Sequence, residues 1–304
     1  MLIPLASRAQ LTVFEFSNSA YRTGIVPRGG SLATIECSGL PLNPGLIRAP
    51  VGGPLPFRLA DIEVLVNGGL SPILSVYIPT PEESATGARQ RIEIQVPLER
   101  NASIEGSRLD YAVPEIRVRG EFQPTTLYLP AGGSIGGGLP GGWFKDSSLY
   151  LTAEHTSDGS PVTHGNPAKP GETITVYAND FFRVWPPPPI GVPVPSAAKY
   201  ENEPEMDAAL AGRGDGFEQG RLYLQAYSRS VDRFCTDTPS LRVLFRGLAP
   251  GKIGVQRIDF LVPLNQAPGD WPLFFNIGSP ADGSGNGCRD NDALSSDYGL
   301  LIVR

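Results

Sequence analysis

Charged residues are scarce in this 304-residue chain, and lysine is the scarcest of them. Only 18% of the residues are Asp, Glu, Lys or Arg, against about a quarter in an average soluble domain. The formal net charge is −6, and only four of the 25 cationic residues are lysine. Proteins that bind nucleic acid gather Lys and Arg into a basic stripe, whereas the arginines here are scattered singly. The composition therefore argues against a nucleic-acid partner.

Long apolar runs are missing as well. No run approaches the roughly 18 residues that a membrane-spanning helix needs, so we expect no membrane insertion. The first nine residues end in the small-x-small pattern Ser7-Arg8-Ala9 of a secretory cleavage site, but the apolar stretch before it is too short for a complete signal. Either an export signal has been trimmed or Met1 is an artefact of the start site, and we favour trimming.

Cysteine occurs only three times. Cys37 lies in a strand-like run and is interpreted as a small buried hydrophobe. Cys235 and Cys288 lie in polar, loop-like segments, and we expect them to form a disulfide, which would restrain the unfolded chain by about 4 kcal/mol. Such a bond implies an oxidising compartment. The absence of CxxC spacing argues against a zinc site.

Glycine (36 residues) and proline (31) are abundant, and together make up about 22% of the chain against roughly 12% in average usage. This surplus excludes long regular helices, while a hydrophobic content of 40% excludes compositional disorder. Period-2 alternation predicts half-buried strands of antiparallel sheets. It occurs in Arg91–Val96, Glu115–Arg119, Thr173–Val176 and Arg257–Val262. We therefore predict an all-β fold, and the chain length suggests two domains of roughly 150 residues each.

An internal repeat supports two copies of one domain. The segment 88–99 aligns with 254–265, and both contain the pattern Q-R-I-acidic-x-x-V-P-L. Earlier in each half, a Pro/Gly turn leads into a strand, at 27–35 and again at 169–176. We expect a first immunoglobulin-like β-sandwich at 1–131, a Gly-rich connector at 132–142, and a second sandwich at 143–304 with an insertion at about 198–240. Within the insertion, 203–211 could form one short helix, and the prolines 186–189 favour a stiff extended segment.

These segments resemble a tandem β-sandwich module found at the C-termini of secreted, mostly uncharacterised proteins of soil Acidobacteria. The resemblance is carried by Gly247–Pro263, Pro268–Asp270, Leu300–Val303, Asp158–Ser160, Asn166–Gly171, Val64–Gly68 and Ile92–Pro97. It implies exported, immunoglobulin-like (TIG-like) sandwiches with no catalytic residues to carry over. The 198–240 insertion and the Cys288 loop depart from the usual pattern, and the module here is nearly the whole chain rather than a tail.

One polar loop resembles the start of a calcium site. Asp282, Ser284, Asn286 and Asp290 place side-chain oxygens at alternating positions among glycines. The twelfth position, however, is Ala293, where a bidentate Glu is expected. The favoured interpretation is a polar loop held in place by the predicted disulfide. A calcium site is the alternative, and we expect no other cofactor.

Catalytic motifs are otherwise unconvincing. Ser134 fits G-x-S-x-G, but it lies in the Gly-rich connector, without the strand and helix that a nucleophile elbow needs. His155 and His164 bracket an Asp158-Gly159 turn, so they either approach each other as a weak metal site or flank the turn as exposed side chains. We favour the interpretation as a turn with exposed histidines. We therefore expect that the protein is not an enzyme.

The function that the sequence favours is therefore structural or adhesive, outside the cell or at its surface, with protein partners or self-association. The apolar segment Leu11–Phe16 could add to the sheet edge of a neighbouring copy, although pairing within its own domain is favoured. The alternative is a carbohydrate-binding module that holds polysaccharide on aromatic side chains. The candidates are Trp143, Trp185, Trp271, Tyr200 and Phe217, and Trp271 is more simply a core residue.

Overall fold

The computed structural model describes residues 11–20, 29–66, 68–98, 114–123, 125–127, 142–179, 189–195, 221–224, 233–235, 241–276, 288–290 and 295–304. Within these ranges the regular structure consists of twenty strands and one five-residue helix, α1 (Pro81–Ala85). Nearly all of the strand pairs are antiparallel. The predicted all-β class is confirmed.

The chain divides into two compact units. Unit 1 consists of Met1–Ser134 together with the short segment Pro189–Pro193, and unit 2 of Ile135–Pro188 together with Val194–Arg304. The chain therefore returns to unit 1 for five residues before it completes unit 2. Residues 132–141 of the predicted connector lie outside the described residues, and Gly142 begins a strand.

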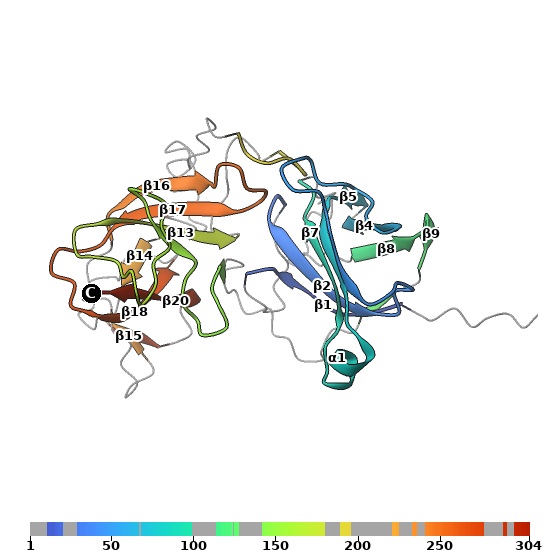
Figure 1. Cartoon of the computed structure of the whole chain (residues 1–304), viewed down its shortest axis with the longest axis horizontal. Coiled ribbons are helices and arrows are strands. Elements are labelled where there is room, and N and C mark those ends of the chain that lie inside the picture. Colours follow the sequence, from blue (N-terminus) through green and yellow to red (C-terminus); the bar gives the residue numbers. More distant parts are fainter. Residues whose placement is uncertain are drawn as a thin grey trace, which may run out of the picture. The chain divides into compact units, whose positions relative to one another are not determined.

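Unit 1 contains two sheets that form separate layers in Figure 1. The six-stranded sheet has the order β10 (Thr125–Leu127), β1 (Leu11–Asn18), β2 (Leu32–Ser38), β7 (Gln90–Gln95), β6 (Ile73–Ile78), β3 (Gly45–Arg48). The four-stranded sheet has the order β5 (Gly69–Ser71), β4 (Ile62–Val66), β8 (Pro114–Val118), β9 (Glu121–Phe122). Strand β1 pairs with β2 on one side and with β10 on the other, so the expectation that Leu11–Phe16 pairs within its own unit is confirmed.

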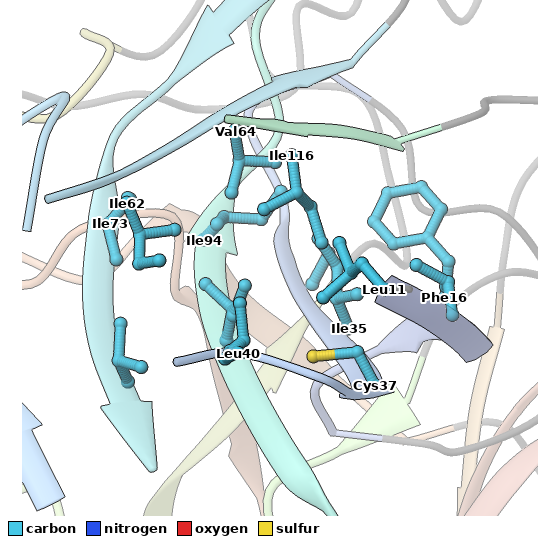
Figure 2. Packing of buried hydrophobic residues seen from close by; sticks show 14 of the residues in the cluster. Leu11, Phe16, Ile35, Cys37, Leu40, Ile62, Val64, Ile73, Ile94 and Ile116 are labelled. Atoms are coloured by element: carbon cyan, nitrogen blue, oxygen red, sulfur yellow. The ribbon is translucent and has the colours of Figure 1, made fainter. Parts of the chain in front are cut away.

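The core of unit 1 lies between the apolar faces of these strands. Ile94 of the six-stranded sheet and Val64 and Ile116 of the four-stranded sheet are completely buried and lie close together in Figure 2. Burying one such side chain stabilises the fold by about 1.5–3 kcal/mol. Cys37 belongs to the same cluster as a free thiol, which confirms its interpretation as a buried hydrophobe. Burial, with a smaller contribution from Glu36, raises the pKa of this thiol to about 12.

Unit 2 is also built from sheets. One sheet has the order β11 (Gly142–Trp143), β13 (Thr173–Asn179), β17 (Gln256–Leu261), β16 (Val243–Leu248), and β12 (Ala153–His155) also pairs with β13. The second has the order β14 (Arg221–Leu224), β18 (Gly269–Asn276), β20 (Ser295–Val303), and β15 (Arg233–Cys235) pairs separately with β19 (Cys288–Asp290). Trp143, Phe260 and Val303 are fully buried in its core.

The predicted insertion at 198–240 contains two of these strands. Strand β14 pairs with β18, so this part of the insertion belongs to the three-stranded sheet. Strand β15 contributes to the separate two-stranded ladder with β19. The short helix predicted at 203–211 and the prolines 186–188 lie outside the described residues.

The sequence repeat occupies equivalent positions in the two units. Strand β7 lies between β2 and β6, and the repeated strand β17 lies between β13 and β16. Just after each repeated strand, an equivalent pair of backbone hydrogen bonds joins the chain to the residues near the start of the neighbouring strand. In unit 1 the amide of Gly30 donates to the Val96 carbonyl (2.8 Å), and in unit 2 the amide of Gly171 donates to the Val262 carbonyl (2.9 Å). The reciprocal bonds run from Val96 to Ser31 and from Val262 to Glu172.

Candidate functional site: a polar and aromatic cluster on unit 2

Three side chains from separate segments meet around Asp270 at the surface of unit 2. The Tyr150 hydroxyl donates a hydrogen bond to Asp270 Oδ2 (3.0 Å), and Arg304 Nη2 donates one to Oδ1 (3.1 Å). His164 Nε2 lies 4.0 Å from Oδ2. We call Tyr150, His164, Asp270 and Arg304 the Asp270 cluster.

Sheet register brings these residues together. Asp270 lies opposite Ile302 in the β18–β20 ladder, two residues before Arg304. Tyr150 forms an isolated parallel bridge with Leu300 of the same strand. The last residues of β20 therefore position both the tyrosine and the arginine beside the carboxylate, although neither is close to Asp270 in the sequence.

The side chains of the Asp270 cluster contact one another, and two of them are largely exposed to solvent. The rings of Tyr150 and His164 meet edge to face, with centroids 4.9 Å apart. The body of Tyr150 packs against the core, while the side chains of His164 and Arg304 are 59% and 43% exposed. The hydrogen bond to Asp270 is the main cause of the raised pKa of Tyr150. The cluster thus offers solvent an aromatic edge, a carboxylate, an imidazole and a guanidinium at fixed positions.

A second polar network lies on the outer face of the β13–β17 pair. Asp259 Oδ1 accepts hydrogen bonds from Thr175 Oγ1 and Arg257 Nε, both at 2.8 Å, and Oδ2 accepts one from Arg257 Nη2 (2.7 Å). Alternation assigns Asp259 to a solvated face, but this prediction is wrong, because the residue is only 6% exposed. Nearby, burial and a hydrogen bond to Glu154 raise the pKa of Tyr177 to about 12. These groups satisfy one another, so the network holds the sheet together.

His155 also differs from its expected environment. The Asp158-Gly159 turn is present, since Gly159 has φ +71° and its amide donates to the His155 carbonyl (2.8 Å). His164 is exposed as expected, but His155 is buried. The two histidines contact different partners, Glu172 for His155 and the Asp270 cluster for His164. In the described part of the chain, no group of three or more His, Cys, Asp or Glu side chains could hold a metal ion.

The residues predicted to form sites fall partly outside the described ranges. Asp282, Ser284 and Asn286 of the calcium loop lie outside them, and Asp290 lies on β19 opposite Arg233. In the same ladder, Cys235 is the register partner of Cys288. The backbone therefore brings the two cysteines opposite each other, and the disulfide itself stays a prediction.

The aromatic candidates for carbohydrate binding are mostly unsuited or outside the described residues. Trp143 is fully buried and offers no surface. Trp271 packs against the core, as expected, and its indole N–H donates to the Ala267 carbonyl (2.7 Å). Trp185, Tyr200 and Phe217 lie outside the described residues. Sequence reasoning missed Tyr150, whose role depends on a contact with Asp270 that is 120 residues away.

No family model matches the chain, and no curated protein matches it.

Among the described residues, no helix combines the length and apolar character required to cross a membrane.

Proposed function

We propose that the protein is a non-catalytic structural or adhesive protein that acts outside the cell or at its surface, and that copies associate through the Asp270 cluster. The observation that carries this proposal is the convergence of Tyr150, His164, Asp270 and Arg304 at an exposed position. Tyrosine and arginine are enriched among the residues that dominate protein–protein binding energy. Because Tyr150 and Arg304 are already hydrogen-bonded to Asp270, these three side chains lose little further conformational entropy when a partner binds.

The strand orders support two tandem immunoglobulin-like sandwiches. In such a sandwich one sheet has the order A-B-E-D and the other C-F-G. Unit 1 contains β1-β2-β7-β6 and β4-β8-β9, which follow this order when its strands are lettered along the chain. Unit 2 contains β11-β13-β17-β16 and β14-β18-β20, which follow it as well. This architecture agrees with the resemblance to exported acidobacterial modules and with a role as a spacer.

The Asp270 cluster is a better candidate for self-association than the sheet edges of unit 1. Strand β3 ends the six-stranded sheet, but it is only four residues long and is flanked by Pro44 and Pro50. Short edge strands and prolines are devices that oppose edge-to-edge pairing. Strand β1 already has a partner on each side. We therefore assign the contact between copies to side chains.

The Asp270 cluster is also the candidate site for the alternative function, which is carbohydrate binding. Polysaccharide binding would place a sugar against the Tyr150 ring, with hydroxyl groups bound to Asp270 and Arg304. Trp143, the fully buried candidate, takes no part in it. The alternative therefore depends on three of the four residues of the Asp270 cluster, and the two functions differ mainly in the ligand.

Sedimentation velocity over a range of concentrations tests the proposal. We expect the wild type to associate, and His164→Ala and Arg304→Ala to weaken association by about tenfold each, since both residues are exposed and can be truncated without a cavity. Arg119→Ala is the matched control, because Arg119 is 77% exposed and lies on unit 1. A wild type that remains monomeric throughout would overturn self-association. Retention on a polysaccharide panel, lost in Arg304→Ala, would establish the alternative.

A further inference from the structure

The segment Pro189–Pro193 belongs to unit 1 although most of the chain around it belongs to unit 2. It is drawn in yellow in Figure 1. Its central residue, Gly191, uses both backbone groups in unit 1. The Gly191 amide donates to Gln95 Oε1 (2.7 Å), and its carbonyl accepts from the Leu55 amide (2.6 Å). We call these five residues the strap.

Gln95 is the residue that makes this contact selective. It is completely buried, and both polar atoms of its amide group are hydrogen-bonded, since Nε2 donates to the Gly30 carbonyl (2.9 Å) while Oε1 accepts from Gly191. Without the strap, Oε1 would lose this hydrogen bond. Alternation in Arg91–Val96 places Gln95 on the polar face of a half-buried strand, but the residue is buried there in contact with the strap.

The backbone of Gly191 also restricts what the site accepts. Gly191 has φ +71°, a conformation that side chains other than glycine rarely adopt. A Cβ atom there would lie 3.1 Å from Pro72 Cγ and 3.5 Å from the Leu55 carbonyl oxygen. The site therefore requires glycine at its centre, and the flanking Pro189 and Pro193 favour an extended chain on either side.

The internal repeat provides a comparison within the molecule. The residue equivalent to Gln95 in the second copy of the repeat is Leu261, which carries no hydrogen-bonding group. Leu261 is partly exposed, whereas Gln95 is completely buried. The amide therefore occurs in the copy that contacts the strap, and an alkyl chain replaces it in the other copy.

We propose that unit 1 carries a peptide-binding site, formed by Leu55, Pro72 and Gln95, for a proline-flanked segment that bends at a central glycine, and that the strap is its intramolecular ligand. The recognition chemistry consists of two backbone hydrogen bonds and a close approach that only glycine permits. Because the strap is attached to the same chain, it is present at a high effective concentration and excludes competing peptides. A second copy that presents this segment would compete for the same site once the strap is displaced.

The test displaces the strap in the full-length protein and supplies it again as a separate molecule. Gly191→Val introduces a side chain that conflicts with Pro72. We expect hydrogen exchange of the Leu55 amide to accelerate by about tenfold or more. A fluorescent peptide with the sequence of residues 186–195 should then bind this variant at least about tenfold more tightly than it binds the wild type.

Two controls separate recognition from general strain. Gly159→Val changes a glycine with the same φ of +71° in open surroundings, and it should neither accelerate exchange at Leu55 nor create peptide binding. The double variant Gln95→Leu/Gly191→Val should lose the peptide, as should a peptide with Val in place of its glycine.

A folded Gly191→Val protein with unchanged exchange at Leu55 and no peptide binding would overturn the proposal. If Gly191→Val does not fold, Gln95→Leu replaces it, because this change copies the residue present in the second repeat. Faster exchange at the Gly191 and Leu55 amides would then support the site, and unchanged exchange would overturn it. None of these outcomes depends on whether copies associate through the Asp270 cluster.

Discussion

His155 Nδ1 lies 2.6 Å from Glu172 Oε1, and this contact ties strand β12 to the turn that leads into β13. The other ring nitrogen, Nε2, lies 3.2 Å from the Asn166 carbonyl oxygen. A carbonyl and a carboxylate both accept hydrogen bonds, so the ring satisfies both partners only when both of its nitrogens are protonated. The structure around the Asp158-Gly159 turn is therefore built for the imidazolium form.

This geometry predicts that stability decreases as the pH rises. Burial lowers the pKa of His155, but the hydrogen bonds to Glu172 and Asn166 together raise it above its ordinary value of 6.5. A folded-state pKa above that of the unfolded chain gives stability that is fully present below about pH 6.5. This stability is lost as the pH rises through the folded-state pKa. Urea unfolding of the wild type at a series of pH values should show the decrease.

The control for this prediction is the other histidine. His155→Gln should remove the pH-dependent decrease, because glutamine does not titrate. His164→Gln should leave it in place, since His164 is exposed and does not contact Glu172. If His155→Gln retains the full pH dependence of the wild type, another group is responsible for it.

Asp259 and Glu93 occupy equivalent positions in the repeat, yet their substitution should have different effects. Asp259→Ala removes the acceptor of three hydrogen bonds from a buried position and should reduce the free energy of unfolding by about 1–3 kcal/mol. Glu93→Ala removes an exposed carboxylate that accepts one hydrogen bond from Ser75, so we expect a loss of about 1 kcal/mol or less. Denaturant unfolding monitored by circular dichroism measures both. Equal losses would contradict a structural role for the Asp259 network.

Cys235 lies opposite Cys288 in the β15–β19 ladder, and this register supports the predicted disulfide. Two thiols form one S–S bond and release two protons and two electrons, which a disulfide oxidant accepts as it is reduced to thiols. Protein from an oxidising compartment should show one reactive thiol after denaturation, that of Cys37, and three after reduction. Replacing both cysteines by serine should cost about 2–5 kcal/mol. Three reactive thiols before reduction would rule out the bond.

The strands were predictable because alternation depends only on neighbouring residues. The segments Arg91–Val96 and Arg257–Val262 match β7 and β17 to within one residue, and their apolar side chains are buried as predicted, apart from the outward-facing Leu261. The repeat also indicated that these strands hold equivalent positions, which they do.

The surroundings of single polar residues were not predictable in the same way. Gln95, Asp259 and His155 are all buried, whereas the sequence pattern assigned them to solvated positions. Their partners Gly191, Thr175 and Glu172 lie 96, 84 and 17 residues away. Alternation indicates which face a side chain occupies, but it does not indicate what covers that face. The Asp270 cluster was missed for the same reason.

Sedimentation equilibrium of the wild-type protein tests the proposed function most directly. The chain has a mass of 32.4 kDa, so association through the Asp270 cluster predicts an average molar mass that rises above this value with concentration. Arg304→Ala should shift the rise to higher concentration, and Arg119→Ala should not. A molar mass that stays at 32.4 kDa at every concentration would contradict the account.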